Sequence, residues 1–260
     1  MPATLPNELL FLTQHPLQRV GIVGVPPLAV IQTLNTRNIE IFDLDALLVR
    51  EDMETTLDLL PRVYCAILRT VVLNAIHLPL DAIVIDVGPG KCDAAFHVAT
   101  ILKEELAIPV ITTINQDNHP FGTSICRTKL GLIEKMSLIT EGVKSAAPSG
   151  DYQPCLPEAG FWGVPPRDFS ILEHFPATTH IYGWSRCMEN KTPADTALEV
   201  HCNLSIPTIF FAQTFCAKTA LAKHLARRHP RALFLDIDLH TGSSAKAKIE
   251  AFLELSGVNR

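Results

Sequence analysis

Short apolar runs rich in valine and isoleucine alternate along the chain with longer stretches in which apolar residues recur every three or four positions. The first pattern is typical of buried strands and the second of amphipathic helices, so their alternation predicts parallel sheets flanked by helices. The predicted strands are residues 19–25, 39–42, 82–87, 109–114, 178–182, 207–212 and 232–237. The predicted helices are residues 26–36, 53–75 with a kink at Pro61, 92–106, 123–146, 217–228 and 244–256.

The composition changes after about residue 146, and proline, glycine and aromatic residues dominate as far as residue 167. Such a stretch is typical of a domain boundary or an extended excursion. We therefore predict an α/β protein with two Rossmann-like lobes, residues 1–147 and residues 148–260. Ligands of open parallel sheets bind beyond the carboxyl ends of the strands, so the residues that follow each strand are the first candidates for function.

Composition narrows the class of protein. The 260 residues, 47% hydrophobic and 19% charged, are enough to bury a sizeable core in one domain or two lobes. A net charge of −5 leaves no basic surplus for a phosphate backbone, which argues against nucleic acid as the main partner. No basic segment precedes the first short apolar stretch, and no apolar run approaches the length of a membrane span. We expect a cytoplasmic protein with no membrane partner.

The cysteines are the most informative polar residues. There are seven, an odd number, and none are in CxxC spacing, so a zinc ribbon or a thioredoxin-like motif is unsupported. A disulfide framework is not expected in an intracellular chain of this size. Cys92 and Cys216 each follow a predicted strand and open a helix, where a helix N-terminus favours the thiolate that binds metals. Cys65 lies within the predicted helix 53–75, which is less diagnostic.

The other candidates have ordinary explanations. Four cysteines are interpreted as buried thiols that are also available as ligands: Cys126, Cys155, Cys187 and Cys202. The glycines of residues 88–93 match neither of the nucleotide-binding glycine patterns. Asp43 and Asp45 do not by themselves make an acid–base pair, and no serine hydrolase, zinc peptidase or kinase signature is present. Weaker ligand candidates follow two other strands: His119, Asp236, Asp238, His240 and Thr241.

Several segments, taken in order, resemble the 2-hydroxyacyl-CoA dehydratase and benzoyl-CoA reductase subunits. They are residues 21–48, the helix segment from Cys65 to Arg69, residues 80–94 with Cys92, and the turn that ends in Cys216. Residues 245–254 resemble the C-terminal helix of the family, with Lys248 where an arginine is usual. The chain is shorter than the family norm, and residues 149–192 match nothing in it.

The resemblance implies a [4Fe–4S] cluster held by Cys65, Cys92 and Cys216, with one iron open to substrate or water. It further implies low-potential one-electron reduction or dehydration of an acyl-CoA-type substrate in anaerobic metabolism. A second related subunit and a separate ATP-dependent activator are the implied partners. Two alternatives stay open: a cluster-free α/β ligand-binding or accessory protein on the same scaffold, and a mononuclear metal site made from Cys187, Cys202 and Cys216.

Overall fold

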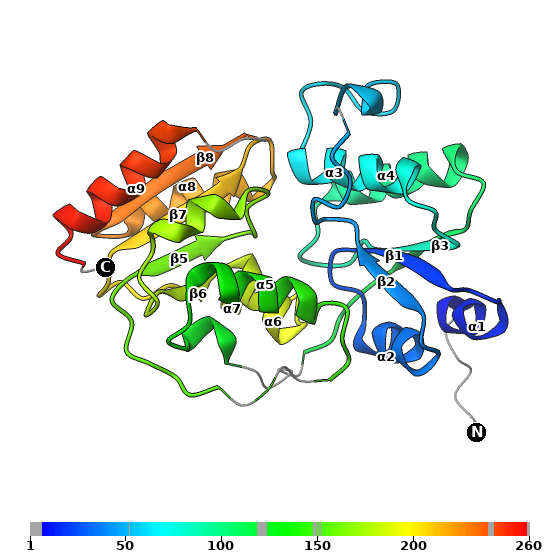
Figure 1. The fold of residues 1–260 in the computed structure, drawn as a ribbon, viewed down its shortest axis with the longest axis horizontal. Coiled ribbons are helices and arrows are strands. Elements are labelled where there is room, and N and C mark those ends of the chain that lie inside the picture. The colour runs from blue at the N-terminus through cyan, green and yellow to red at the C-terminus, as the bar shows by residue number, and fades with distance from the viewer. Residues whose placement is uncertain are drawn as a thin grey trace.

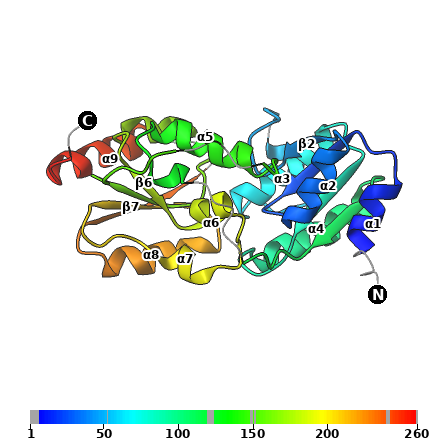
Figure 2. The same ribbon diagram turned by 90° about the horizontal axis from the view of Figure 1, so that it is seen from below.

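Two lobes lie side by side in the computed structural model, each built on a four-stranded sheet with helices on its faces (Figures 1 and 2). The structure describes residues 7–51, 53–118, 124–147, 150, 152–238 and 242–258. All neighbouring strands are parallel, so the prediction of an α/β fold with two parallel sheets is confirmed. None of the helices described is long and apolar enough to cross a membrane.

The first lobe has the strand order β2–β1–β3–β4. Its strands are β1 (Arg19–Val23), β2 (Glu40–Asp43), β3 (Ala82–Asp86) and β4 (Val110–Thr113). Its helices are α1 (Asn7–Gln14), α2 (Leu28–Thr36), the short 3-10 helix η1 (Met53–Thr56), α3 (Ala66–His77) and α4 (Asp93–Glu105). Every residue of β3 is buried, as expected for an inner strand of a parallel sheet that is covered on both faces.

The second lobe repeats this arrangement with the strand order β6–β5–β7–β8. Its strands are β5 (Gly160–Gly163), β6 (His180–Tyr182), β7 (Thr208–Gln213) and β8 (Ala232–Ile237). The helices that pack on it or lead into it are η2 (Ile125–Arg127), α5 (Leu132–Gly142), η3 (Phe169–His174), α6 (Trp184–Asn190), α7 (Thr196–Val200), α8 (Lys218–Arg228) and α9 (Ser243–Leu255). The boundary predicted at residues 147 and 148 falls beside residues that the structure does not describe, and stays a prediction.

The structure corrects the predicted helix 53–75. Only η1 and α3 are helical there, and α3 begins at Ala66. A proline inside a helix removes a backbone donor and clashes with the preceding turn, so Pro61 ends the regular pattern instead of kinking it. Cys65 is therefore the N-cap residue of α3 and not a residue inside a helix. Within residues 123–146, likewise, the long helix starts only at Leu132.

Strand β5 lies in the stretch rich in proline, glycine and aromatic residues, which the composition predicts to be a domain boundary or an extended excursion. Its glycines are required by close packing against β7: a Cβ on Gly160 would lie 2.5 Å from Oγ1 of Thr208, and one on Gly163 would lie 2.4 Å from the carbonyl oxygen of Phe211. Glycine lowers the strand propensity of a segment, which is why the sequence pattern misses this central strand.

The two lobes are joined by buried contacts. One apolar cluster includes Val84 of β3 and Phe161 of β5, so the core continues from one lobe to the other. The side chain of Asn115, after β4, donates to the carbonyl oxygens of Val25 (2.9 Å) and Lys191 (3.4 Å). Gly90 packs directly on the backbone of Pro193. The loops beyond the carboxyl ends of strands from both sheets therefore meet along one boundary.

Candidate functional site

Cys65, Cys92 and Cys216 come together at this boundary. Cys65 is the N-cap of α3, Cys92 is the N-cap of α4, and Cys216 lies two residues before α8. Cys65 is buried in an apolar cluster of the first lobe, and Cys92 and Cys216 pack against the same cluster. Thiols from three separate segments, which belong to both lobes, therefore lie close together.

The thiols interact directly. The Cys216 thiol donates a hydrogen bond to the sulfur of Cys65, which lowers the pKa of Cys65 to about 7, and the backbone amides of Ile67 and Leu68 act in the same direction. The same hydrogen bond, together with burial, raises the pKa of Cys216. Near neutral pH, Cys65 is thus the member of this pair that readily becomes a thiolate, the form that binds metals.

The surroundings of Cys65 favour negative charge, and all three thiols lie near helix N-termini. The helices α3, α4 and α8 each begin within two residues of a cysteine, and each N-terminus carries the partial positive charge of its helix dipole. Lys91 precedes Cys92, and its charge further lowers the pKa of Cys65. The donor set therefore fits an anionic, thiolate-ligated group.

Among the described residues, no three or more His, Cys, Asp or Glu side chains are placed to hold one metal ion. A mononuclear site needs its sulfurs about 2.3 Å from a single atom. An iron–sulfur cubane instead binds each thiolate to a different iron, so its cysteines do not surround one point.

The structure does not bring Cys187, Cys202 and Cys216 together, because they pack in three different apolar clusters. Burial raises the pKa of Cys187 to about 12, and its thiol donates to the carbonyl oxygen of Asp195. Burial also raises the pKa of Cys202. These thiols stay protonated at neutral pH. Sγ of Cys155 lies 3.8 Å from Nε2 of His180, which contacts the Cys155 carbonyl oxygen at 2.9 Å.

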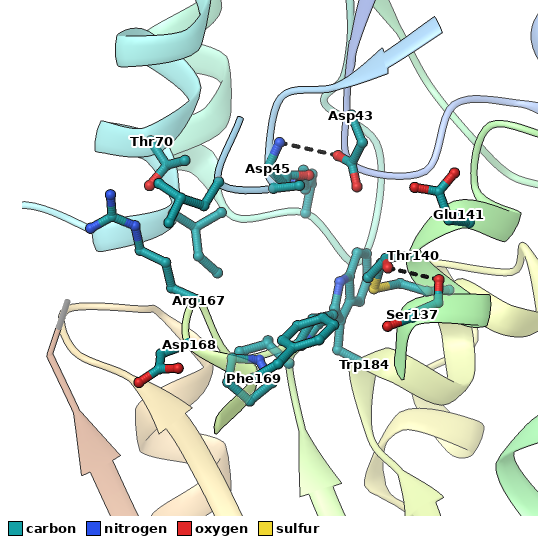
Figure 3. A pocket seen from close by; sticks show the side chains of 18 residues that line it. Asp43, Asp45, Thr70, Ser137, Thr140, Glu141, Arg167, Asp168, Phe169 and Trp184 are labelled. Atoms are coloured by element: carbon teal, nitrogen blue, oxygen red, sulfur yellow. Dashed lines mark hydrogen bonds and ion pairs between the residues drawn. The ribbon is translucent and has the colours of Figure 1, made fainter. Parts of the chain in front are cut away.

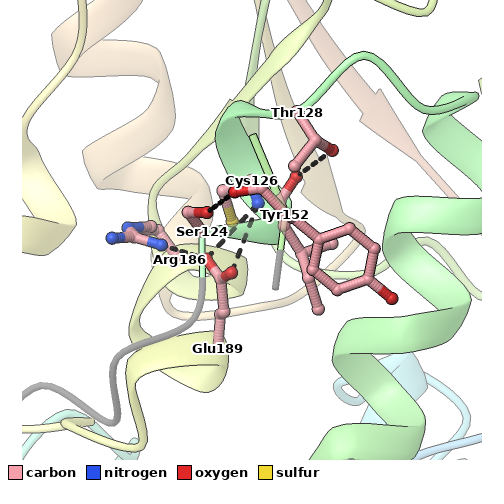
Figure 4. A network of polar contacts seen from close by, with 7 residues as sticks. Ser124, Cys126, Thr128, Tyr152, Arg186 and Glu189 are labelled. Carbon is pink, nitrogen blue, oxygen red and sulfur yellow. Dashed lines mark hydrogen bonds and ion pairs between the residues drawn. The ribbon is translucent and has the colours of Figure 1, made fainter. Parts of the chain in front are cut away.

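Cys126 belongs to a separate buried network (Figure 4). Its backbone N–H donates to both carboxylate oxygens of Glu189 at 3.4 Å, and Glu189 is also paired with Arg186. The hydroxyl of Ser124 donates to the carbonyl oxygen of Tyr152 at 2.8 Å. Burial raises the pKa of Cys126 well above its ordinary value. This network fixes η2 against α6. The Cys126 thiol therefore has a structural role.

A cavity of about 590 Å³ opens beside Lys91, between the lobes (Figure 3). The first lobe lines it with residues that follow β2, with Lys91, and with the first turns of α3. The second lobe lines it with α5, with the segment from Val164 to Phe169 after β5, and with α6. Its walls combine apolar and ionisable side chains, the usual character of a small-molecule site.

Asp43 and Asp45 form one end of this cavity (Figure 3). Burial, and then the charge of Asp45, raise the pKa of Asp43 to about 8. Asp43 is therefore largely a neutral acid at neutral pH. One carboxylate oxygen of Asp45 accepts from the backbone N–H of Gly24 at 2.6 Å and lies 3.4 Å from Nζ of Lys91. The sequence pattern did not identify Asp43 and Asp45 as a site, although their position at the end of a strand could have indicated one.

The weaker candidates gain little from the structure. Asp236 accepts a hydrogen bond from the hydroxyl of Thr214 at 2.9 Å, and the carbonyl oxygen of Asp238 accepts one from Gln213 at 2.7 Å. These contacts hold the ends of β7 and β8 together. His119, His240 and Thr241 lie outside the described residues.

Comparisons with known proteins do not support the family that the sequence suggests. No protein-family model and no curated protein matches the chain. One solved structure found by similarity of fold is that of MenH from S. aureus, at 12% identity, over 92% of this chain and 94% of that chain, with a TM-score of 0.21. So low a TM-score supports no argument about fold or function.

The assignment to the 2-hydroxyacyl-CoA dehydratase and benzoyl-CoA reductase subunits is therefore wrong, since no model of that family matches. The motifs behind it are short pieces of strand, turn and helix. Every parallel α/β fold is built from such pieces, so they do not identify a family.

Proposed function

We propose that the chain is an iron–sulfur redox protein in which Cys65, Cys92 and Cys216 hold a [4Fe–4S] cluster at the boundary of the lobes. The observation that carries the proposal is that three thiols from three helix starts share one partly buried site. When bound, such a cluster supplies one-electron transfer at low potential and an iron without a protein thiolate that can act as a Lewis acid.

The residues around the thiols prepare the site for ligation. The lowered pKa of Cys65 supplies one thiolate near neutral pH, and Cys216 must release the proton that it shares with Cys65. Lys91 offsets the negative charge that three thiolates bring.

The neighbouring cavity suggests where a substrate binds. Lys91 lines the cavity and is also next to Cys92 in the chain, so the cavity and the thiol site share this side chain. We propose that the reduction or dehydration takes place on a small molecule held there. An acyl-CoA-type substrate, a second subunit and an ATP-dependent activator stay predictions, since they rest on the sequence resemblance alone.

The test is to purify the protein without oxygen, to supply iron and sulfide, and to measure absorbance and bound iron. A brown protein with about four irons per chain is expected. Cys65→Ala, Cys92→Ala and Cys216→Ala should each lose most of the colour and iron. Cys202→Ala is the matched control and should retain both, because Cys202 packs in another apolar cluster.

Protein that stays colourless and iron-free after this treatment would contradict the proposal, as would full iron retention in Cys216→Ala. A colourless protein that still binds small molecules in the cavity would favour the alternative of a cluster-free ligand-binding protein, for which the cavity is the supporting observation.

A further inference from the structure

The cavity between the lobes has two chemically different ends and an apolar wall between them. Arg167 marks the first end, and Figure 3 shows its side chain reaching along the cavity toward Thr70 of α3. The backbone N–H of Arg167 is held by Oε1 of Gln213 at 3.2 Å, which fixes the start of the side chain. A guanidinium in such a place suits the two oxygens of a carboxylate.

A second guanidinium, that of Arg69, lies near this end. Burial and the nearby charge of Arg69 both lower the pKa of Arg167. Arg69 lies in α3 of the first lobe and is buried, whereas Arg167 belongs to the second lobe. Two positive side chains, one from each lobe, therefore lie near each other at this end of the cavity.

Apolar and aromatic side chains form the wall of the cavity. Phe169 and Trp184 lie beside each other along its floor in Figure 3, and Met188 and Val164 extend the same surface. Trp184 is held in place by Nζ of Lys218, 4.4 Å from the ring centroid. A flat, apolar ligand body gains most from such a surface, because aromatic rings prefer to pack against one another.

The second end presents an unused acceptor. Oδ1 of Asp45 is buried and has no hydrogen-bond partner among the described residues, while Oδ2 of the same side chain is engaged by Gly24 and Lys91. A buried carboxylate oxygen without a donor is costly, and a ligand hydroxyl would remove that cost. Asp43 beside it, as a neutral acid, can itself donate to the same hydroxyl.

We infer that the cavity binds a small aromatic carboxylic acid, with its carboxylate against Arg167, its ring on Phe169 and Trp184, and a hydroxyl at its far end against Asp45. The volume of about 590 Å³ leaves ample room for such a molecule. That this acid is the substrate rests on the proposed function, whereas its binding requires no cluster.

The test is calorimetric titration of the full chain with three probes: 3-(4-hydroxyphenyl)propionate, 3-phenylpropionate and 3-phenylpropionamide. We expect both acids to bind at least tenfold more tightly than the amide, which lacks the charge. The hydroxylated acid should bind several times more tightly than 3-phenylpropionate, because only it carries a donor for Asp45. Equal binding of the two acids would show that the ligand does not need a hydroxyl against Asp45.

Arg167→Gln should weaken both acids at least tenfold and leave the weak binding of the amide unchanged, which also shows that the variant is folded. Arg228→Gln, on the exposed end of α8, is the matched control and should bind all probes as the unaltered chain does. The inference is overturned if acid and amide bind alike, if no probe binds, or if Arg167→Gln has no effect.

The same titrations are made on iron-loaded and on colourless protein. Binding to colourless protein supports the ligand assignment even where the iron content contradicts the proposed function. Iron-loaded protein that binds none of the probes leaves the proposed function standing and rejects this ligand.

Discussion

Replacing Gly90 with alanine is expected to be among the most damaging single substitutions in the chain. Gly90 has φ of +89°, a conformation that costs energy for any residue with a side chain. A Cβ there would lie 1.8 Å from the carbonyl oxygen of Pro193, which is backbone in the other lobe and cannot turn aside. The lobes must then move apart next to Cys92.

We expect Gly90→Ala to lower the free energy of unfolding by about 2–4 kcal/mol, measured by urea unfolding. Gly131→Ala is the matched control, since a Cβ at position 131 meets nothing within 4 Å and the substitution should have little effect. Equal stability of the two variants would show that the contact between Gly90 and Pro193 does not hold the lobes together. Gly90→Ala should also bind less iron than Gly131→Ala if the proposed cluster forms.

Asp43→Asn should stabilise the protein, and more so as the pH rises. The pKa of Asp43 is raised from 3.8 to about 8, first by burial and then by the charge of Asp45. Between these two values the unfolded chain has released the proton and the folded chain still holds it, so each rise in pH favours unfolding. Asparagine has the same shape and carries no charge to bury.

The stability difference between Asp43→Asn and the unaltered chain should therefore widen between pH 5 and pH 8, and then level off. We expect the widening to be on the order of 2 kcal/mol, measured by urea unfolding at pH 5, 7 and 9. Asp58→Asn, at an exposed position, is the control and should show no such widening. Parallel pH profiles for the two variants would mean that Asp43 is ionised in the folded protein.

Local patterns along the chain were enough to predict most of the fold. The strands around Val84 and Phe210 are continuous apolar runs because both faces of each sheet are covered, and such runs are visible in the sequence. Strand β5 was missed because close packing against β7 requires glycine at both of its ends. The start of α3 was misplaced because a 3-4 pattern of apolar residues upstream of Pro61 continues through irregular structure.

The candidate site could be predicted only in part. Cys92 and Cys216 follow strands and open helices, a pattern that local sequence reveals. The cavity could not be predicted, because Asp43 and Trp184 line one space only once two separately folded sheets have met. No local sequence pattern gives the distance in space between residues that lie so far apart in the chain. Arg167 lies in a stretch whose composition indicated only a boundary.

The order in which the thiols appear in the chain has a consequence for how the protein is made. During translation Cys65 and Cys92 leave the ribosome long before Cys216, and the second sheet must form before Cys216 can reach them. A nascent or truncated chain therefore holds two of the three thiols in a partly built, exposed site. Any group that needs all three can be taken up only by a finished chain, so its insertion would mark the completion of folding.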